Sequence, residues 1–269
     1  LLNHTSGIKS PWDHPQWNFK KDYTAAELKQ IIEEVPPAFD QPGKEMYYSN
    51  SGYILLTWII EKITGIPYDQ YFQKNIFSPL QMTATRHLND TLMPEANGAQ
   101  PYKVLSSKKY LSMNMHIGPK ASGAGGWIST ARDLHRFMSG LYSNKLFKPE
   151  TFAIMRSGNG STPTQERFRN YAYGIEHFHN TYLPGGDMFG HNGGGGGFSI
   201  DAFLDPASGY IVTSCTNMYQ NSRAIAANYL NTALNHALQP VQPPSWVKVY
   251  DKIDAMGIDA FVADGKKHL

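Results

Sequence analysis

Apolar residues recur at helical spacing in the early part of the chain. Thr24 and Glu27 have the spacing of a capping box, which predicts a helix that runs to Val35 and stops at the two prolines that follow. A second apolar stripe predicts a helix over residues 51–65, which ends at a glycine. A proline then favours a third helix over residues 68–77. The early chain is therefore expected to be helical.

The middle of the chain begins with a segment of weak periodicity. Residues 83–122 are rich in Asn, Ser, Lys and Met, so we expect an extended loop there. Thr130 and Asp133 then predict the start of a helix with one apolar face, and Pro149 begins a shorter helix. Helical structure is thus expected to resume after the loop.

The pattern changes to strands in the later part of the chain. The expected strands are residues 171–178, a segment around 188–190, 198–204 and 210–216. A tight hairpin should join the last two strands, and a helix is expected over about residues 222–237. Helices followed by an antiparallel sheet and a closing helix predict an α+β fold with a helical lobe. We expect residues 1–238 to form one domain and residues 239–269 to be a C-terminal tail, for which the pattern indicates no role.

The composition limits the kinds of partner that the chain could bind. Of the 269 residues, 41% are hydrophobic and 17% are charged, which is ordinary for a folded protein. The net charge of +2 gives no electrostatic reason to expect nucleic acid or an anionic membrane as a partner. The longest apolar run, residues 53–60, is too short to span a bilayer.

Cysteine and histidine usage indicates neither a disulfide nor a metal site. Cys215 is the only cysteine, which excludes an intrachain disulfide and a multi-cysteine metal site. It lies in the apolar run 211–215, where we expect a buried and unreactive thiol. The histidines and acidic pairs show no metal-ligand pattern, so we expect no metal and no other cofactor.

Three stretches carry the polar and glycine residues that indicate a functional site. They are LLNHTSG at residues 1–7, PGKEMYYSNSGY at residues 42–53 and GHNGGGGGF at residues 190–198. In the first stretch, His4 and Ser6 are expected to brace a turn beneath the site. In the second, Asn50 could instead cap the helix that follows it. The glycine run lacks the Lys-Ser/Thr pair of a phosphate-binding loop and does not open a helix, so nucleotide binding is rejected.

These stretches, in this order, resemble the serine β-lactamase-related family, which includes class C β-lactamases, D-Ala-D-Ala carboxypeptidases and many esterases. They are similar to the family's LLxHTSGL, PGxxFxYSNxGYxLL and GHxGxxxGF, and the connecting segments FSPLQM and GAGGWISTARDLHRFM match as well. The runs PLQM and HNG depart slightly from the usual PLGM and HTG. The resemblance covers roughly residues 1–235 and implies a penicillin-binding-protein/serine β-lactamase-like fold.

The resemblance also implies roles for residues of the second stretch. Tyr48 would be the proton shuttle of an acyl-transfer reaction, and a phenol serves as a base only if neighbouring cations favour its phenolate. The side-chain amide N–H of Asn50 would donate a hydrogen bond to the substrate. The nucleophile and one cation would be a Ser-x-x-Lys pair, which we expect upstream of Leu1, because the chain opens there without a methionine.

The third stretch would form the strand along which the substrate binds, which is called the substrate strand below. His191 would be the second cation, and Asn192 and Gly193 would bind the substrate, with Gly193 leaving the strand free of a side chain. The backbone N–H of Gly194 would donate to the oxyanion. Classical penicillin-recognising enzymes carry a lysine where this chain has His191, and a histidine is mostly neutral at pH 7. We therefore expect weak carboxylate recognition and a preference for esters or amides over penicillins.

Two Ser-x-x-Lys matches lie within the chain itself. Ser6 to Lys9 overlaps the first stretch, and Ser106 to Lys109 lies in a polar segment without helical periodicity. Both are interpreted as chance.

The predicted function is a serine hydrolase that cleaves a D-amino-acid peptide, a β-lactam or a carboxylic ester through an acyl-enzyme. The alternative is a non-catalytic protein of the same fold that binds peptidoglycan or peptides. A small molecule or short peptide would be the partner in either case. The resemblance favours an exported or periplasmic protein, and the sequence leaves the oligomeric state open.

Overall fold

The computed structural model describes residues 1–19, 21–87, 98–106, 109–113, 122–157, 162–163, 171–179, 186–218, 232, 245–260 and 263. The chain divides into two compact units. The first unit consists of Leu1–Leu92, His116–His191 and Ala202–Thr213, and the second consists of Met93–Met115, Asn192–Asp201 and Ser214–Leu269. The prediction of one domain over residues 1–238 with a separate tail stays a prediction.

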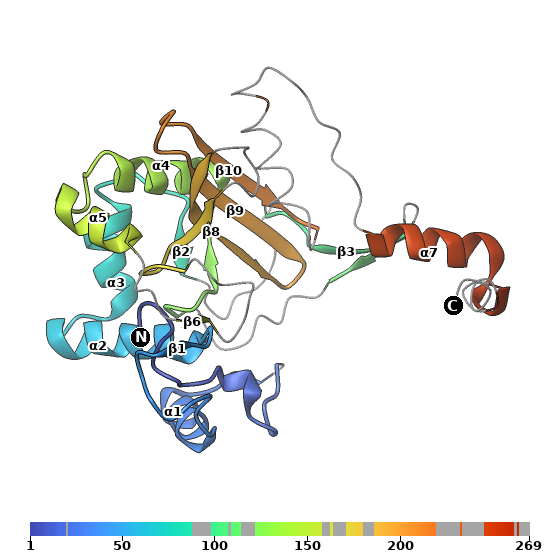
Figure 1. The fold of residues 1–269 in the computed structure, drawn as a ribbon, viewed down its shortest axis with the longest axis horizontal. Helices are drawn as coiled ribbons and strands as arrows, with labels where there is room; N and C mark the ends of the chain where they lie inside the picture. Colours follow the sequence, from blue (N-terminus) through green and yellow to red (C-terminus); the bar gives the residue numbers. More distant parts are fainter. Residues whose placement is uncertain are drawn as a thin grey trace. The chain divides into compact units, whose positions relative to one another are not determined.

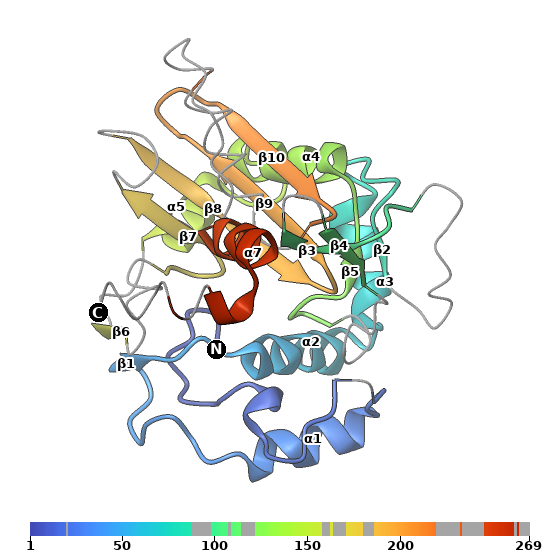
Figure 2. The same cartoon turned by 90° about the vertical axis from the view of Figure 1, so that its right-hand side faces the viewer.

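Helices in the first unit follow the apolar stripes of the sequence (Figure 1). They are α1 (Ala25–Glu34), α2 (Asn50–Thr64), α3 (Tyr68–Phe72) with a π-helical turn (Gln73–Phe77), α4 (Ala131–Tyr142) and α5 (Pro149–Arg156). A 3₁₀ turn, η1 (Pro11–Asp13), precedes them. The capping box of α1 is confirmed, because the Thr24 hydroxyl accepts from the backbone N–H of Glu27 and the Glu27 carboxylate accepts from that of Thr24. Helix α1 lies below α2 in both views (Figures 1 and 2).

The start of α2 corrects one sequence interpretation. Ser49, and not Asn50, is the N-cap: its hydroxyl accepts from the N–H of Gly52 at 3.1 Å. Asn50 is the first helical residue, and its own N–H donates to the Ser10 hydroxyl at 3.0 Å. At the other end, Gly65 adopts the left-handed conformation (φ 68°) that closes the helix.

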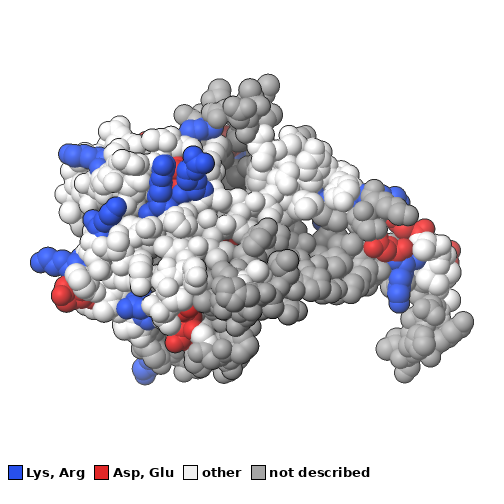
Figure 3. Space-filling model, turned by 90° about the horizontal axis from the view of Figure 1, so that it is seen from above, with Lys and Arg blue, Asp and Glu red and all other residues white. Residues whose placement is uncertain are grey.

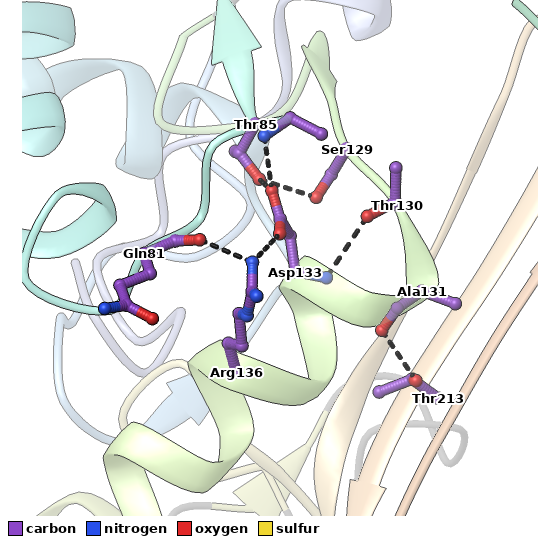
Figure 4. Close-up of polar contacts among 9 residues, drawn as sticks. Gln81, Thr85, Ser129, Thr130, Ala131, Asp133, Arg136 and Thr213 are labelled. Carbon is purple, nitrogen blue, oxygen red and sulfur yellow. Dashed lines mark hydrogen bonds and ion pairs between the residues drawn. The ribbon is translucent and has the colours of Figure 1, made fainter.

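Helix α4 begins at a buried carboxylate (Figure 4). The Thr130 hydroxyl accepts from the N–H of Asp133, which confirms the predicted cap. The Asp133 carboxylate accepts from the N–H of Ala84 at 2.8 Å and the hydroxyl of Thr85 at 3.0 Å. Arg136 donates to it from the next turn at 3.1 Å. These bonds tie the helix to the segment that follows the π-helical turn.

The main sheet has the strand order β10-β9-β8-β7. Its strands are β7 (Glu176–His179), β8 (Asp187–Gly195), β9 (Phe198–Leu204) and β10 (Ile211–Thr216). Strands β7 and β8 pair antiparallel, and the predicted hairpin between β9 and β10 is confirmed by the bond from the N–H of Asp205 to the carbonyl of Tyr210 at 2.9 Å. Strands β8, β9 and β10 each have residues in both units.

Two strands differ from their predicted limits. The strand expected from Tyr171 begins only at Glu176, because Gly174 turns the chain with a φ of 78° and leaves Tyr171 in an isolated bridge to Glu176. Strand β8 is longer than expected and continues through the glycine run to Gly195. Pairing with neighbouring strands overrides the low strand propensity of glycine there.

Helices α4 and α5 pack their apolar faces on the residues of β8, β9 and β10 that belong to the first unit. The buried core residues there are Met138, Leu141, Phe152, Ile175 and Leu204. The Thr213 hydroxyl donates to the carbonyl of Ala131 at 2.9 Å, which fixes β10 at the start of α4. This core supports β8, the strand that carries the third sequence stretch.

Short strands replace part of the predicted loop. Residues 83–122 were expected to be extended loop, but β2 (Arg86–His87) pairs with β5 (Trp127–Ile128), and β3 (Tyr102–Ser106) pairs antiparallel with β4 (Lys109–Ser112). Strand β4 is exposed at every position, so its sequence does not alternate between buried apolar and exposed polar residues. The hydrophobic pattern therefore did not predict this pair of strands. Elsewhere, β1 (Glu45–Met46) pairs in parallel with β6 (Thr162–Pro163).

The tail contains a helix, α7 (Ser245–Met256). It packs on β3 within the second unit, and Lys109 forms an ion pair with Asp254 at 2.8 Å. The helix expected over residues 222–237 lies outside the described residues except for residue 232. None of the helices in the described part of the chain combines the length and apolarity needed to cross a membrane.

Lysine and arginine side chains on the face shown in Figure 3 form small groups separated by uncharged surface. Cys215 corrects another expectation, because it is exposed and not buried. On a strand, successive side chains point to opposite faces, and Ser214 is the buried neighbour. Partial desolvation, followed by the nearby Asp201 carboxylate, raises the pKa of the Cys215 thiol.

Candidate active site

Tyr48 lies in an aromatic cluster centred on His4, where the first two sequence stretches meet. The His4 ring centroid is 4.1 Å from that of Tyr48, 5.2 Å from that of Tyr53 and 4.6 Å from that of Tyr171. Tyr48 lies two residues after the end of β1 and directly before Ser49, the cap of α2, so both elements fix its backbone. Its ring packs on Met46 and Tyr171.

His4 braces this cluster, as the sequence predicted. It has a left-handed backbone (φ 59°) and is only 1% exposed. Its Nδ1 accepts from the N–H of Ser49 at 3.0 Å, and its carbonyl accepts from the N–H of Tyr47 at 2.9 Å. Burial, followed by repulsion from His191, lowers the pKa of His4 to about 3. His4 is therefore a neutral support on both sides of Tyr48.

His191 reaches the same cluster from β8. Its ring centroid is 6.3 Å from that of Tyr48 and 5.6 Å from that of Tyr171. A Cβ at Gly190 would collide with the backbone carbonyl of Ala202, so glycine at this position lets β8 lie close to β9. The structure thus brings together Tyr48 and His191, two residues that the sequence predicted for the site.

Two buried residues contact His191 that sequence reasoning did not identify. The Tyr171 hydroxyl is 3.1 Å from Nε2 of His191, and the Glu176 carboxylate is 3.8 Å from its Nδ1. Tyr171 is 5% exposed and Glu176 is 4% exposed. Burial raises the pKa of Tyr171 well above its ordinary value, and burial also raises that of Tyr53. The cluster therefore contains phenols, a carboxyl group and two histidine rings.

Asn50 and the residue before Tyr48 are both held by the loop after the first stretch. The Asn50 amide nitrogen is 3.5 Å from the Ser10 hydroxyl, and the Tyr47 hydroxyl donates to the Asp13 carboxylate at 3.4 Å. The Tyr47 contact turns its phenol toward this loop. The role of Asn50 toward a substrate stays a prediction.

The remaining predicted residues follow His191 on β8. Asn192 is half-buried, whereas Gly193 and Gly194 are exposed. Among the described residues, none has an atom within 4 Å of a Cβ built at Gly193. These three residues belong to the second unit, and their roles toward a substrate stay predictions.

Other polar groups in the first unit have local partners. His177 stacks on Phe189 at 4.3 Å and contacts the Asp187 carboxylate at 2.8 Å. A separate open cavity of about 560 Å³ lies beside α3 and is lined by Asp69, Gln70, Gln73, Lys74, Ser78, Arg86, His87 and Trp127. Within the described ranges, no group of three or more His, Cys, Asp or Glu residues could hold a metal ion.

Solved structures establish the class of fold. The chain is similar to a D-stereospecific amidohydrolase from Streptomyces, with a TM-score of 0.72, 24% identity and coverage of 88% of this chain and 71% of that one. It is also similar to a penicillin-binding protein from Bacillus halodurans, with a TM-score of 0.70, 21% identity and coverage of 87% and 70%. The fold is therefore of the penicillin-binding-protein/β-lactamase type, as predicted.

The sequence comparisons establish the family. Residues 1–235 match the model of the family described as Beta-lactamase, and the chain belongs to that family. It is 29% identical to penicillin-binding protein 4* of Bacillus subtilis over 74% of this chain and 46% of the relative. It is 27% identical to the unguisins hydrolase ungD' of Aspergillus campestris, over 94% and 49%. The chain spans about half the length of these relatives.

Proposed function

We propose that the chain carries the proton shuttle and the substrate strand of a serine hydrolase that cleaves an ester or amide through an acyl-enzyme. The observation that supports this best is the 6.3 Å separation of the Tyr48 and His191 rings. These residues belong to two different family motifs, and a buried support holds each of them. If Tyr48 had only a packing role, there would be no reason for a residue of a second family motif, His191, to lie beside its ring.

The functional group of each residue suggests its role in the proposed reaction. Tyr48 accepts the proton of the nucleophilic serine and later passes it to the leaving group. Asn50 donates to the substrate, and the backbone N–H of Gly194 donates to the oxyanion. Asn192 and Gly193 contact the substrate along β8. The serine and its lysine are expected upstream of Leu1.

Relatives and structural neighbours suggest which substrates to test first. One neighbour is a D-stereospecific amidohydrolase and another is a D-amino acid amidase from Ochrobactrum anthropi. One relative is named as a hydrolase of unguisins. We therefore propose an amide next to a D-amino acid residue as the first candidate, with carboxylic esters and β-lactams as the comparison.

The direct test is to label the product of the full open reading frame with a fluorophosphonate. The serine oxygen would displace fluoride at phosphorus, which adds one phosphonyl group to the intact mass. We expect a single adduct, located by peptide mapping upstream of Leu1. Absence of the adduct together with binding of a peptidoglycan peptide would overturn the hydrolase and support the non-catalytic alternative.

A further inference from the structure

The open cavity beside α3 contains none of the residues that surround Tyr48 and His191. Its volume is about 560 Å³, and every residue that lines it belongs to the first unit. Protein cavities of this size typically bind small ligands through an apolar wall and a few polar groups that fix the orientation of the ligand. The lining of this cavity contains both kinds of group.

Trp127 provides the apolar wall of the cavity. Strand pairing places it opposite His87, and the centroids of the two rings are 5.2 Å apart. The rings of Phe72 and Phe77 pack on the indole at 5.8 Å and 5.2 Å. The indole N–H donates to the carbonyl of Ser122 at 3.1 Å, which fixes the orientation of the ring. Because Trp127 is half-buried, it offers the cavity apolar surface on a rigid support.

The π-helical turn places two complementary polar groups on the lining. The N–H of Ser78 donates to the carbonyl of Gln73 at 2.9 Å, which is the five-residue spacing of a π-helix. This wide turn brings the two side chains together, and the amide N–H of Gln73 donates to the Ser78 hydroxyl at 3.1 Å. The side-chain carbonyl of Gln73 can still accept, and the Ser78 hydroxyl can still donate its proton. One acceptor beside one donor matches the N–H and C=O of a peptide bond.

Side chains of opposite charge also line the cavity. Asp69 is half-buried on α3, and Lys74 is exposed on the π-helical turn. Within the described part of the chain, these two side chains form no ion pair with each other or with another residue. Arg86 adds a second cation to the lining. The cavity therefore offers both a carboxylate and cationic groups to a ligand.

This combination of charges favours a zwitterion over other small ligands. A purely apolar ligand would cover Asp69 and Lys74 without pairing them, which costs desolvation free energy. A simple anion would gain from Lys74 but would be repelled by Asp69. A ligand that carries one ammonium group and one carboxylate can pair with both side chains.

We propose that the cavity beside α3 binds a short peptide with free termini, namely a dipeptide that carries an apolar side chain. Its ammonium group pairs with Asp69, and its carboxylate pairs with Lys74. Its peptide bond hydrogen-bonds to Gln73 and Ser78, and its apolar side chain packs on Trp127. The inference goes beyond the proposed hydrolase function and does not depend on it.

Calorimetric titration of the full-length protein with L-alanyl-L-phenylalanine tests the class of ligand. L-residues are used because the proposed hydrolase acts next to D-residues, and the mass of the recovered peptide shows that it stays intact. The N-acetyl derivative lacks the ammonium group, and the C-terminal amide lacks the carboxylate. We expect saturable binding of the dipeptide and about 5- to 10-fold weaker binding of each derivative. Absence of saturable binding up to roughly 10 mM would overturn the inference.

Variants paired with these derivatives locate the two termini. Asp69→Asn should weaken binding of the dipeptide about 5- to 10-fold but leave that of the N-acetyl derivative unchanged. Lys74→Gln should weaken binding of the dipeptide but leave that of the amide unchanged. Lys145→Gln, an exposed lysine outside the lining, is the matched control and should bind every ligand as the wild type does. Equal losses for the dipeptide and its derivative in either variant would reject the assigned contacts.

Tryptophan fluorescence locates the apolar side chain. The dipeptide should change the emission of the wild-type protein, and Trp127→Phe should abolish this change while its thermal unfolding shows that it is folded. If Trp127→Phe does not fold, Gln73→Ala at the exposed rim replaces it and should weaken binding instead. A saturable emission change that persists in Trp127→Phe, or unchanged binding by Gln73→Ala, would place the ligand elsewhere. Because none of these readouts uses the nucleophile, a protein that fails to label with fluorophosphonate can still bind the dipeptide.

Discussion

Two buried polar clusters in the first unit are built on opposite principles. At the start of α4, the Asp133 carboxylate is 1% exposed and accepts from Ala84, Thr85 and Arg136. These donors surround a buried charge, and each oxygen of the carboxylate accepts at least one hydrogen bond. This arrangement is typical of a structural network, because it is stable only when every member has its partner.

The cluster around His4 is arranged differently. His4 has a left-handed backbone, and its buried Nε2 has no hydrogen-bond partner among the described residues. The buried hydroxyl of Ser51, in the first turn of α2, also lacks a partner within that part of the chain. Backbone strain and unsatisfied polar groups lower stability, and they are found preferentially at functional sites. The contrast indicates that the structure around Tyr48 is locally less stable than the structure around Asp133, where the buried charge is fully hydrogen-bonded.

The largest expected effect on stability is at Asp133. Asp133→Ala leaves several buried donors unpaired, so we expect the free energy of unfolding to fall by about 3 kcal/mol. Urea unfolding of the purified protein measures this loss. The exposed Asp40→Ala is the control and should change stability by less than about 0.5 kcal/mol. A loss below about 1 kcal/mol at Asp133 would break the contrast between the two clusters.

A pH dependence is expected from His4. Its pKa is about 3 in the folded chain against an ordinary value of 6.5, so the unfolded chain binds the proton first as the pH falls. Stability is therefore lost below about pH 6.5, by about 2 kcal/mol between pH 7 and pH 5.

The variant His4→Asn isolates this contribution. Asparagine tolerates a positive φ and keeps an acceptor for the N–H of Ser49, but it does not titrate. The difference in stability between pH 7 and pH 5 should shrink by the contribution of His4. His135→Asn, at an exposed position on α4, should keep the wild-type difference. Identical pH profiles for wild type and His4→Asn would contradict the account of the cluster.

The smallest expected loss of stability is at two helix N-caps, which can be compared with each other. Ser49→Ala and Thr24→Ala each remove an N-cap hydroxyl and should each cost about 1 kcal/mol of stability. Because Ser49 also fixes the backbone next to Tyr48, only Ser49→Ala should slow fluorophosphonate labelling of the folded protein. Equal labelling rates in both variants would show that the cap of α2 does not position the site.

Local rules explain what the sequence could predict. Capping boxes and apolar stripes fixed the starts of α1 and α4, since these signals involve residues within a few positions of one another. They could not choose between Ser49 and Asn50, both good cap residues. The choice depends on tertiary contacts: Ser49 donates its N–H to His4, and Asn50 donates its N–H to Ser10.

The site could be predicted only as far as the motifs reach. Tyr48 and His191 lie inside motifs. Glu176 contacts His191 because of the register of β7 against β8, and Tyr171 lies beside them through its isolated bridge to Glu176. Pairing register depends on contacts that are distant in sequence, so no local pattern signals it. Cys215 was predicted to be buried for a similar reason, since an apolar run does not say which face of a strand is covered.

The central claim is that Tyr48 acts as the proton shuttle, and the neighbouring tyrosine provides a matched test. In the full-length protein, Tyr48→Phe and Tyr47→Phe remove one hydroxyl each from adjacent positions, and Tyr47 points to Asp13. The measurement is the rate of fluorophosphonate labelling of both variants relative to wild type. We expect Tyr48→Phe to slow labelling by about 100-fold or more, and Tyr47→Phe to change it by less than about 3-fold. Equal rates in the two variants would contradict the assignment of Tyr48.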